Sequence, residues 1–307
     1  MTQRVGVVDR VAAGIAWRDC GPANADTPPI VFLHGLGGTR ESWGPQLDAF
    51  GATRRCIAWD MPGYGASDPV APLTYPAIVQ RLVDLLDLLA LERVDLVGLS
   101  FGGMHALHTV LAHPGRIRRL VLADTSPAFG MDGTRREDWV AARLAPIEAG
   151  RTPADIAPDV LDAITATPLT GDIRAETIAG FARIGADGFR AAVRCLPDND
   201  VRAELHRITA PTLVIVGALD AETPPSYAEA LHRGIAGSTL RVVDGAGHLT
   251  PAEAPDAFNA LVAEFLAPDH PADHPPDRPT PDRPTPDRPT LDEPRHGQPS
   301  AGERTDP

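Results

Sequence analysis

Short apolar runs alternate with amphipathic stretches along most of this chain. The runs are rich in β-branched residues, and turn-forming segments bound them. Between two runs, residues 75–91 place Ile78, Leu82, Leu85 and Leu89 on one face of a helix. Such an alternation predicts a mostly parallel, doubly wound α/β sheet that binds ligands at the carboxyl ends of its strands. The runs expected to be strands are residues 30–33, 56–59, 94–97, 118–123, 212–217 and 239–243.

The N-terminal part has a different pattern. Apolar and polar residues alternate over residues 3–19, which predicts an antiparallel hairpin at the edge of the sheet. We expect Val5, Val7, Ile15 and Trp17 to face the core.

The strand pattern stops after residue 124 and resumes at residue 212. The helical pieces between these points are roughly residues 135–149, 154–166, 173–185 and 188–196. A helical insertion between two strands predicts a cap over the strand ends. We therefore expect an α/β core of residues 1–128 and 199–267 and a helical cap of residues 129–198. Within the core, a further helix is expected over residues 252–266.

The composition changes again at residue 268. Twelve of the residues in 268–307 are proline, and Pro-Asp-Arg-Pro-Thr occurs three times in succession from Pro276 to Thr290. Because such a segment has too little apolar surface to offset its ordering entropy, we expect a disordered tail, in preference to a polyproline docking segment.

Charge and cysteine content narrow the class of protein. The net charge of −13 over 307 residues argues against nucleic acid or an anionic membrane as a partner. No apolar run approaches the length of a membrane span, and the start of the chain lacks the apolar core of a signal peptide. Cys20, Cys56 and Cys195 are too far apart for a metal motif, so we expect reduced cysteines in a cytoplasmic protein.

A glycine-flanked serine provides the strongest chemical signal. Gly98-x-Ser100-x-Gly102 follows the apolar run 94–97 and precedes a helix-compatible stretch. A sharp strand-to-helix turn strains the serine backbone and leaves no room for a Cβ at the two flanking positions. Ser100 is therefore a candidate nucleophile at a helix N-terminus, where backbone amides favour developing negative charge.

The run 30–33 also ends in glycines, in His34-Gly35-Leu36-Gly37-Gly38. Such a loop turns backbone N–H groups toward a cavity, so we expect the amides of Leu36 and Phe101 to form an oxyanion hole.

Asp220 and His248 complete a possible catalytic set. Each of Ser100, Asp220 and His248 follows a predicted strand, which places all three on one edge of the sheet. In such an arrangement His248 would take the proton of Ser100, and Asp220 would hold the imidazole in the required tautomer. Asp124, after the run 118–123, is an alternative acid, whereas Asp244 fits a structural role on its turn.

Together these motifs resemble the serine α/β-hydrolase family over roughly residues 3–266. The resemblance rests on Gly98-x-Ser100-x-Gly102-Gly103, on Gly217-x-x-Asp220-x-x-Thr223-Pro224 and on Gly247-His248, with His34-Gly35 and the loop 60–67. Within that family, residues 200–215 and Trp139 are most similar to 3-oxoadipate enol-lactonases, although residues 194–198 depart from them.

The resemblance and the motifs predict a hydrolase that acts on a small ester or lactone without a cofactor or metal. His105 and His108 have no accompanying carboxylate or cysteine cluster, so they are not expected to be metal ligands. Trp139 and Arg143 lie four residues apart, on one face of a predicted helix, and could present an aromatic wall and a guanidinium to an anionic lactone. The oligomeric state is not predicted.

Two other functions stay open. The same three residues could cleave a carbon–carbon bond of a ring-cleavage product, or the fold could serve as a receptor with little turnover. Dehalogenase and epoxide hydrolase chemistry is disfavoured because both need a carboxylate where Ser100 stands.

Overall fold

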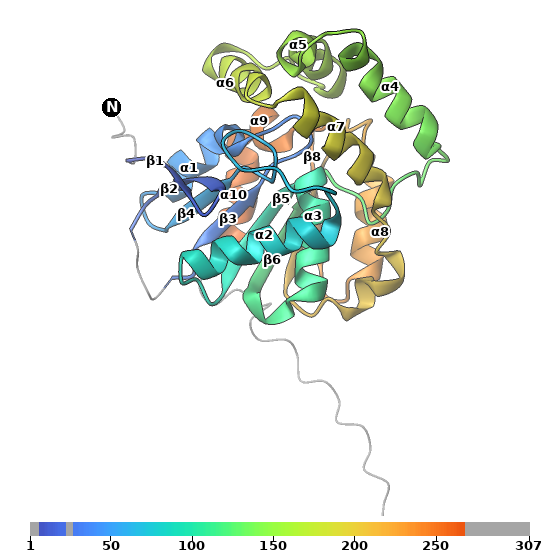
Figure 1. Cartoon of the computed structure of the whole chain (residues 1–307). Helices are drawn as coiled ribbons and strands as arrows, with labels where there is room; N and C mark the ends of the chain where they lie inside the picture. The colour runs from blue at the N-terminus through green and yellow to red at the C-terminus, as the bar shows by residue number, and fades with distance from the viewer. Residues whose placement is uncertain (1–5, 23–26, 268–307) are drawn as a thin grey trace, which may run out of the picture. The chain divides into compact units, whose positions relative to one another are not determined.

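The computed structural model describes residues 6–22 and 27–267 (Figure 1). These residues form an eight-stranded sheet with the strand order β1-β2-β4-β3-β5-β6-β7-β8. Strands β1 and β2 pair antiparallel, β2 joins β4 antiparallel, and the remaining pairs are parallel. The expected α/β-hydrolase fold with a mostly parallel sheet is confirmed. The strands are β1 (Val8–Ala12), β2 (Ile15–Cys20), β3 (Ile30–Leu33), β4 (Cys56–Trp59), β5 (Val94–Leu99), β6 (Ile117–Ala123), β7 (Thr212–Gly217) and β8 (Thr239–Val243).

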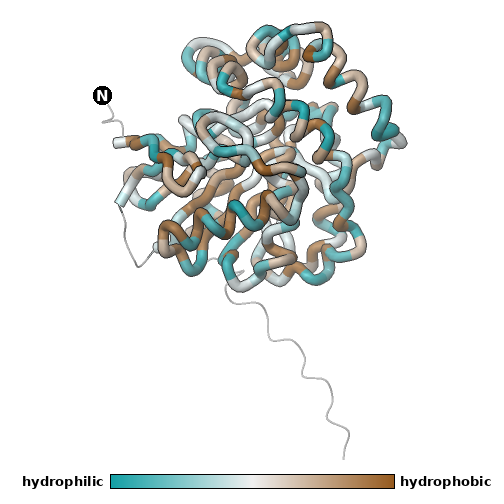
Figure 2. The backbone as a smooth tube through the Cα atoms, viewed as in Figure 1, coloured by the Kyte–Doolittle hydropathy of each residue, from teal (hydrophilic) through white to brown (hydrophobic). Residues whose placement is uncertain are grey.

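Helices cover both faces of this sheet. Successive side chains of a strand point to opposite faces, so Ile30 and Phe32 join one apolar cluster while Val31 and Leu33 join the other. Helices α2 and α3 and α8 pack on the second face, and α1 and α10 pack on the first. Figure 2 shows apolar residues along the central strands. The helices of the core are α1 (Gly44–Phe50), α2 (Tyr75–Leu88), α3 (Phe101–Ala112), α8 (Pro225–Gly234), α9 (Thr250–Glu253) and α10 (Pro255–Leu266), with short 3-10 helices η1 (Arg40–Trp43), η2 (Pro114–Arg116), η3 (Leu196–Asp198) and η4 (Arg202–Arg207).

The edge hairpin forms as expected, but its burial does not fully match the expectation. Ile15 and Trp17 are buried on β2. Val7 is 40% exposed, so its prediction as a core residue is wrong. Val7 lies just before β1, which within the described residues is an edge strand that pairs only with β2 and is mostly exposed. Val5 lies outside the described residues.

Two further differences concern helices. The segments η1 and α1 were not expected from the sequence, and at the start of η1 the Ser42 hydroxyl accepts from the Thr39 amide at 3.1 Å. The helix expected over residues 252–266 is interrupted at Ala254, which has φ −135° and ψ 58°. The following Pro255 disfavours helical backbone at Ala254, so α10 starts anew after it.

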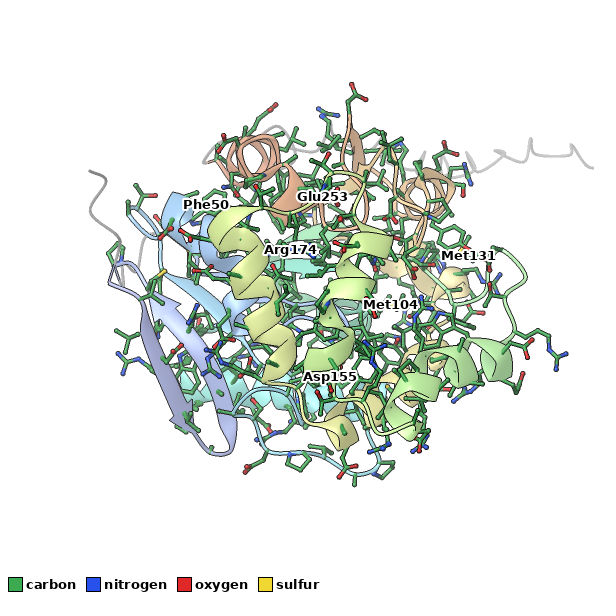
Figure 3. All side chains as sticks on the ribbon, turned by 90° about the horizontal axis from the view of Figure 1, so that it is seen from above. Phe50, Met104, Met131, Asp155, Arg174 and Glu253 are labelled. Carbon is green, nitrogen blue, oxygen red and sulfur yellow. The ribbon has the colours of Figure 1, made fainter. Side chains whose placement is uncertain are left out.

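Four α-helices lie between β6 and β7, ahead of η3 and η4, and we call these four the cap helices. They lie together beside the carboxyl ends of the strands (Figure 1). In the view from above, the helices that carry Asp155 and Arg174 lie in front of the core (Figure 3). The cap helices are α4 (Arg136–Glu148), α5 (Pro153–Ile164), α6 (Gly171–Ala182) and α7 (Ala186–Cys195).

The remaining expectations from the sequence concern membrane spans, the tail and the location of the protein. Within the described residues, no helix is both long and apolar enough to cross a bilayer. The proline-rich tail of residues 268–307 lies outside the described residues. The cytoplasmic location stays a prediction.

Candidate active site

Ser100 occupies the turn between β5 and α3. Its backbone has φ 53° and ψ −118°, a conformation that residues other than glycine rarely adopt. The Ser100 amide donates to the Ala123 carbonyl at 2.9 Å, and the Ser100 carbonyl accepts from the Thr125 hydroxyl at 2.7 Å. Ala123 is the last residue of β6, and Thr125 lies two residues beyond it. The two hydrogen bonds therefore hold the strained turn against the end of β6.

The two flanking glycines are required by close backbone approaches. A Cβ at Gly98 would lie 2.4 Å from the Gly102 carbonyl oxygen. A Cβ at Gly102 would lie 2.1 Å from the Leu33 carbonyl oxygen at the end of β3. The expected reason for the glycine spacing is therefore confirmed.

The structure brings Ser100, His248 and Asp220 together although 148 residues separate the first two. His248 Nε2 lies 2.9 Å from Ser100 Oγ, so the hydroxyl can donate to the imidazole. On the other side of the ring, Nδ1 lies 2.9 Å from Asp220 Oδ2 and 3.0 Å from Oδ1, within range to donate to the carboxylate. The arrangement can activate the serine hydroxyl as a nucleophile.

The Asp220 carboxylate is held by its own loop. The amides of Glu222 and Thr223 donate to Oδ1 at 2.9 Å, and the Thr223 hydroxyl donates to Oδ2 at 2.8 Å. Burial favours the protonated acid, but the charge of His248 and these hydrogen bonds outweigh it. The pKa of Asp220 is therefore lowered, and the group is an anion at neutral pH.

The same pair shifts His248 in the opposite direction. Burial favours the neutral imidazole, but the charge and hydrogen bond of Asp220, followed by the charges of Asp124 and Glu222, outweigh it. The pKa of His248 is raised above its ordinary value of 6.5. Asp220 thus stabilises the imidazolium that forms when His248 accepts a proton.

This shift predicts the pH dependence of activity. His248 accepts the Ser100 proton only when it is neutral, so activity is lost as the pH falls through the pKa of His248. We expect the acidic limb of kcat/KM, measured with an ester that does not titrate, to have its midpoint above 6.5. A midpoint at or below 6.5 would contradict the stabilisation of the imidazolium by Asp220.

Asp124, the alternative acid, makes a different set of contacts. Its carboxylate is fully buried and accepts from the Gly217 amide at 2.9 Å, the Thr250 amide at 2.9 Å and the Thr250 hydroxyl at 2.8 Å. Burial and the charge of Asp220 raise the pKa of Asp124 to about 7. Asp124 therefore connects two segments. Through Gly217 it binds the end of β7, just before the Asp220 loop, and through Thr250 it binds the segment that follows His248.

The amides expected to form the oxyanion hole belong to the residue after Ser100 and to the loop after β3. Phe101 is the first residue of α3, and Leu36 follows Gly35, where a Cβ would lie 3.3 Å from Ser100 Cβ. Among the described residues, neither amide has a hydrogen-bond acceptor. Tyr64 fixes the loop by donating to the Leu36 carbonyl at 2.7 Å. Both N–H groups are thus available to a ligand.

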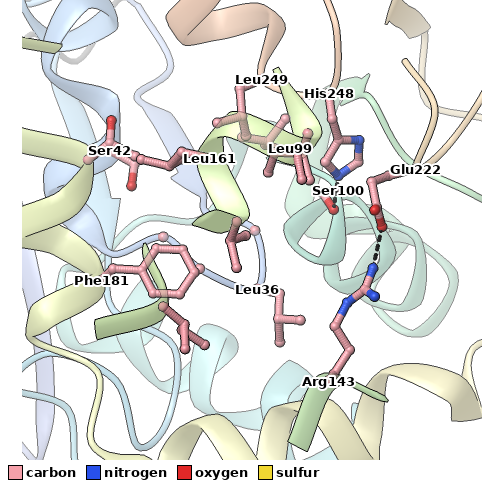
Figure 4. A pocket seen from close by; sticks show the side chains of 18 of the residues that line it. Leu36, Ser42, Leu99, Ser100, Arg143, Leu161, Phe181, Glu222, His248 and Leu249 are labelled. Carbon is pink, nitrogen blue, oxygen red and sulfur yellow. Dashed lines mark hydrogen bonds and ion pairs between the residues drawn. The ribbon is translucent and has the colours of Figure 1, made fainter. Parts of the chain in front are cut away.

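A cavity of about 390 Å³ opens over Ser100 and His248 (Figure 4). Its walls come from the glycine-rich loop after β3 and from the cap helices, and they are largely apolar. Trp139 and Arg143, expected to contact substrate, both line it. A second cavity of about 240 Å³ also reaches Ser100 and His248. Apolar side chains of the first cavity include Leu36, Leu99, Ile156, Leu161, Phe181 and Leu249.

Arg143 already has an anionic partner. Its Nη2 lies 2.6 Å from Glu222 Oε2, and its guanidinium lies 5.0 Å from the centre of the Trp139 ring. Glu222 was not expected from the sequence, because it lies 79 residues from Arg143 and carries no motif signal beyond its place two residues after Asp220.

Sequence analysis also missed Glu253. One of its carboxylate oxygens accepts from the amides of Gly247, Ala166 and Thr167, at 3.0, 2.8 and 3.0 Å. The His248 amide in turn donates to the Ile164 carbonyl at 3.0 Å. These bonds join the loop of His248 to the connection between α5 and α6, so the cap helices are attached next to the imidazole.

Comparison with known proteins agrees with this arrangement. The family model described as "Alpha/beta hydrolase family" matches residues 30–261. The chain is 30% identical over 254 residues to 3-oxoadipate enol-lactonase 1 of Acinetobacter baylyi, covering 80% of this chain and 90% of that protein. It is 28% identical over 242 residues to the pimeloyl-[acyl-carrier protein] methyl ester esterase of Neisseria meningitidis, covering 77% and 92%.

A solved structure gives the same result. The crystal structure of the enol-lactonase from Burkholderia xenovorans LB400 superposes with a TM-score of 0.74 at 27% identity, covering 84% of this chain and 99% of that one. The family match spans most of the chain and includes Ser100, Asp220 and His248. The chain belongs to the alpha/beta hydrolase family.

Proposed function

We propose that this chain is a serine hydrolase that cleaves small, uncharged carboxylic esters or lactones through an acyl-enzyme. The observation that carries the proposal is the hydrogen-bonded chain of Ser100, His248 and Asp220 beneath an apolar cavity. The expected class, a carboxylic ester hydrolase, agrees with relatives named as an enol-lactonase and a methyl ester esterase.

Each group has a role in the proposed reaction. Ser100 Oγ attacks the carbonyl carbon while His248 Nε2 takes its proton, and the amides of Leu36 and Phe101 bind the oxyanion. His248 then returns the proton to the leaving oxygen as the ester bond breaks. Water, deprotonated by His248, attacks the acyl-enzyme, and His248 gives this proton to Ser100 Oγ as the bond to the serine breaks and the acid leaves.

The charge of the cavity supports an uncharged substrate. A substrate carboxylate is costly to bury unless a cation meets it. Arg143 could supply that cation, but Glu222 is already bound to its guanidinium. The apolar side chains that line the remaining wall favour an aliphatic or aromatic acyl group.

3-Oxoadipate enol-lactone, which carries a carboxylate, is the second candidate substrate. The similarity to the enol-lactonases of Acinetobacter baylyi and Burkholderia xenovorans, together with the position of Trp139 and Arg143 in the cavity, favours it. If the lactone is the substrate, Arg143→Ala raises its KM much more than that of its neutral methyl ester. A wild-type preference for the methyl ester instead supports an uncharged substrate.

A turnover screen tests the proposal. The purified chain is assayed with small lactones, aryl esters and vinylogous diketones, with Ser100→Ala as the matched control, and is labelled with an organophosphonate. We expect ester or lactone turnover and labelling of Ser100, both lost in the control. Cleavage of diketones with esters nearly untouched would support the carbon–carbon hydrolase. Absence of both turnover and labelling would support a receptor.

A further inference from the structure

Glu222 and Arg143 form an ion pair at the catalytic centre. Arg143 comes from cap helix α4, and Glu222 from the loop after β7, two residues beyond Asp220. Both line the two cavities that reach Ser100 and His248. In Figure 4 the Arg143 side chain extends toward Glu222, which lies beside His248. An acyl group bound to Ser100 would therefore share a cavity with this pair.

Glu222 is held where it can engage Arg143. Its backbone amide donates to Asp220 Oδ1 at 2.9 Å, which ties it to the candidate catalytic acid. Arg143 is confined from the other side by the Trp139 ring, 5.0 Å from its guanidinium carbon. Both side chains are about one-third exposed, at 34% and 37%. The pair is thus positioned by its surroundings and remains accessible from the cavities.

No unpaired cation faces either cavity within the described part of the chain. The second guanidinium on the walls, that of Arg151, lies 3.0 Å from Asp159 Oδ2. Asp132, on the wall of the smaller cavity, accepts from the amide and hydroxyl of Thr134. An anionic acyl group would have to displace Glu222 from Arg143, or remain close to its carboxylate.

We propose that Glu222 is a specificity-determining residue, which neutralises Arg143 and so selects uncharged acyl groups over anionic ones. This inference rests on the proposed ester hydrolase function. It implies that the cavity already contains a carboxylate-binding group, the Arg143 guanidinium, which Glu222 occupies. Removing the charge of Glu222 alone is expected to open the site to anionic esters.

Glu222→Gln tests the inference, since it removes the charge with little change of shape and leaves the backbone bond to Asp220 intact. The substrates are the p-nitrophenyl monoesters of succinic, glutaric and adipic acid, each paired with its terminal methyl ester. The readout is the ratio of kcat/KM for the anionic to the neutral ester, at fixed ionic strength. We expect this ratio to rise about tenfold for at least one chain length.

Asp198→Asn is the matched control. Asp198 pairs with Arg136, another arginine of α4, but does not line either cavity. We expect this variant to leave the ratio within about twofold of wild type, and Arg143→Gln combined with Glu222→Gln to abolish the gain. An unchanged ratio in Glu222→Gln, or an equal rise in Asp198→Asn, would overturn the inference. If wild type hydrolyses none of these esters, the proposed function itself fails.

Discussion

We expect the replacement of Ser100 by alanine to lower kcat by about 10³-fold or more, and His248→Ala to have an effect of similar size. Both losses follow from the 2.9 Å contact between Ser100 Oγ and His248 Nε2, which is the only route found for moving the nucleophile's proton within the described residues. Because the two groups act as a unit, the double variant loses little more than either single variant. Steady-state kinetics with an activated ester measure kcat for the two single variants and for the double variant.

The same experiment needs a control for folding. Ser238→Ala removes a serine of the connection between α8 and β8, far in sequence from Ser100 and outside both cavities. We expect it to keep near wild-type kcat, while the melting temperature of Ser100→Ala stays close to that of the wild type. Near wild-type hydrolysis by Ser100→Ala or His248→Ala, or additive losses in the double variant, would contradict the assignment.

Asp220→Asn is expected to lower kcat by up to about 10⁴-fold. Asp220 accepts from His248 Nδ1 through both oxygens, at 2.9 and 3.0 Å. An amide turned toward the ring stabilises the wrong tautomer, in which Nε2 carries a proton and cannot accept one from Ser100. The loss should therefore appear mainly in kcat, and pH cannot restore it.

Asp124→Asn separates the two candidate acids. Asp124 accepts three hydrogen bonds from Gly217 and Thr250, and among the described residues none from His248. Replacing it should lower the melting temperature, because an amide nitrogen then faces a buried donor. Its effect on kcat should be far smaller than that of Asp220→Asn. The reverse order of effects would place the acid after β6.

Much of the fold follows from local patterns in the chain. The parallel strands and their flanking helices depend on apolar periodicity within short segments, and the turn at Ser100 depends on glycines two residues away on each side. The order of Ser100, Asp220 and His248 at strand ends was also predictable, because parallel strands expose their carboxyl ends along one edge of the sheet. Local spacing is sufficient for these features.

Other features depend on contacts between segments distant in the chain. Val7 is exposed because it leads into β1, and the position of β1 at the edge is a property of the assembled sheet. The sequence leaves Asp124 as an alternative to Asp220, whereas the structure shows that the Asp220 carboxylate lies against His248 Nδ1 and that Asp124 accepts from Thr250.

The sequence alone therefore determined the α/β architecture, the strained turn at Ser100 and the three side chains that meet at the edge of the sheet. Only the tertiary structure decided that Arg143 is paired with Glu222 and that Glu253 joins the His248 loop to the cap helices. The physical reason is range. Periodicity and turn chemistry act over a few residues, but an ion pair between groups 79 residues apart depends on how the cap helices pack over the strand ends.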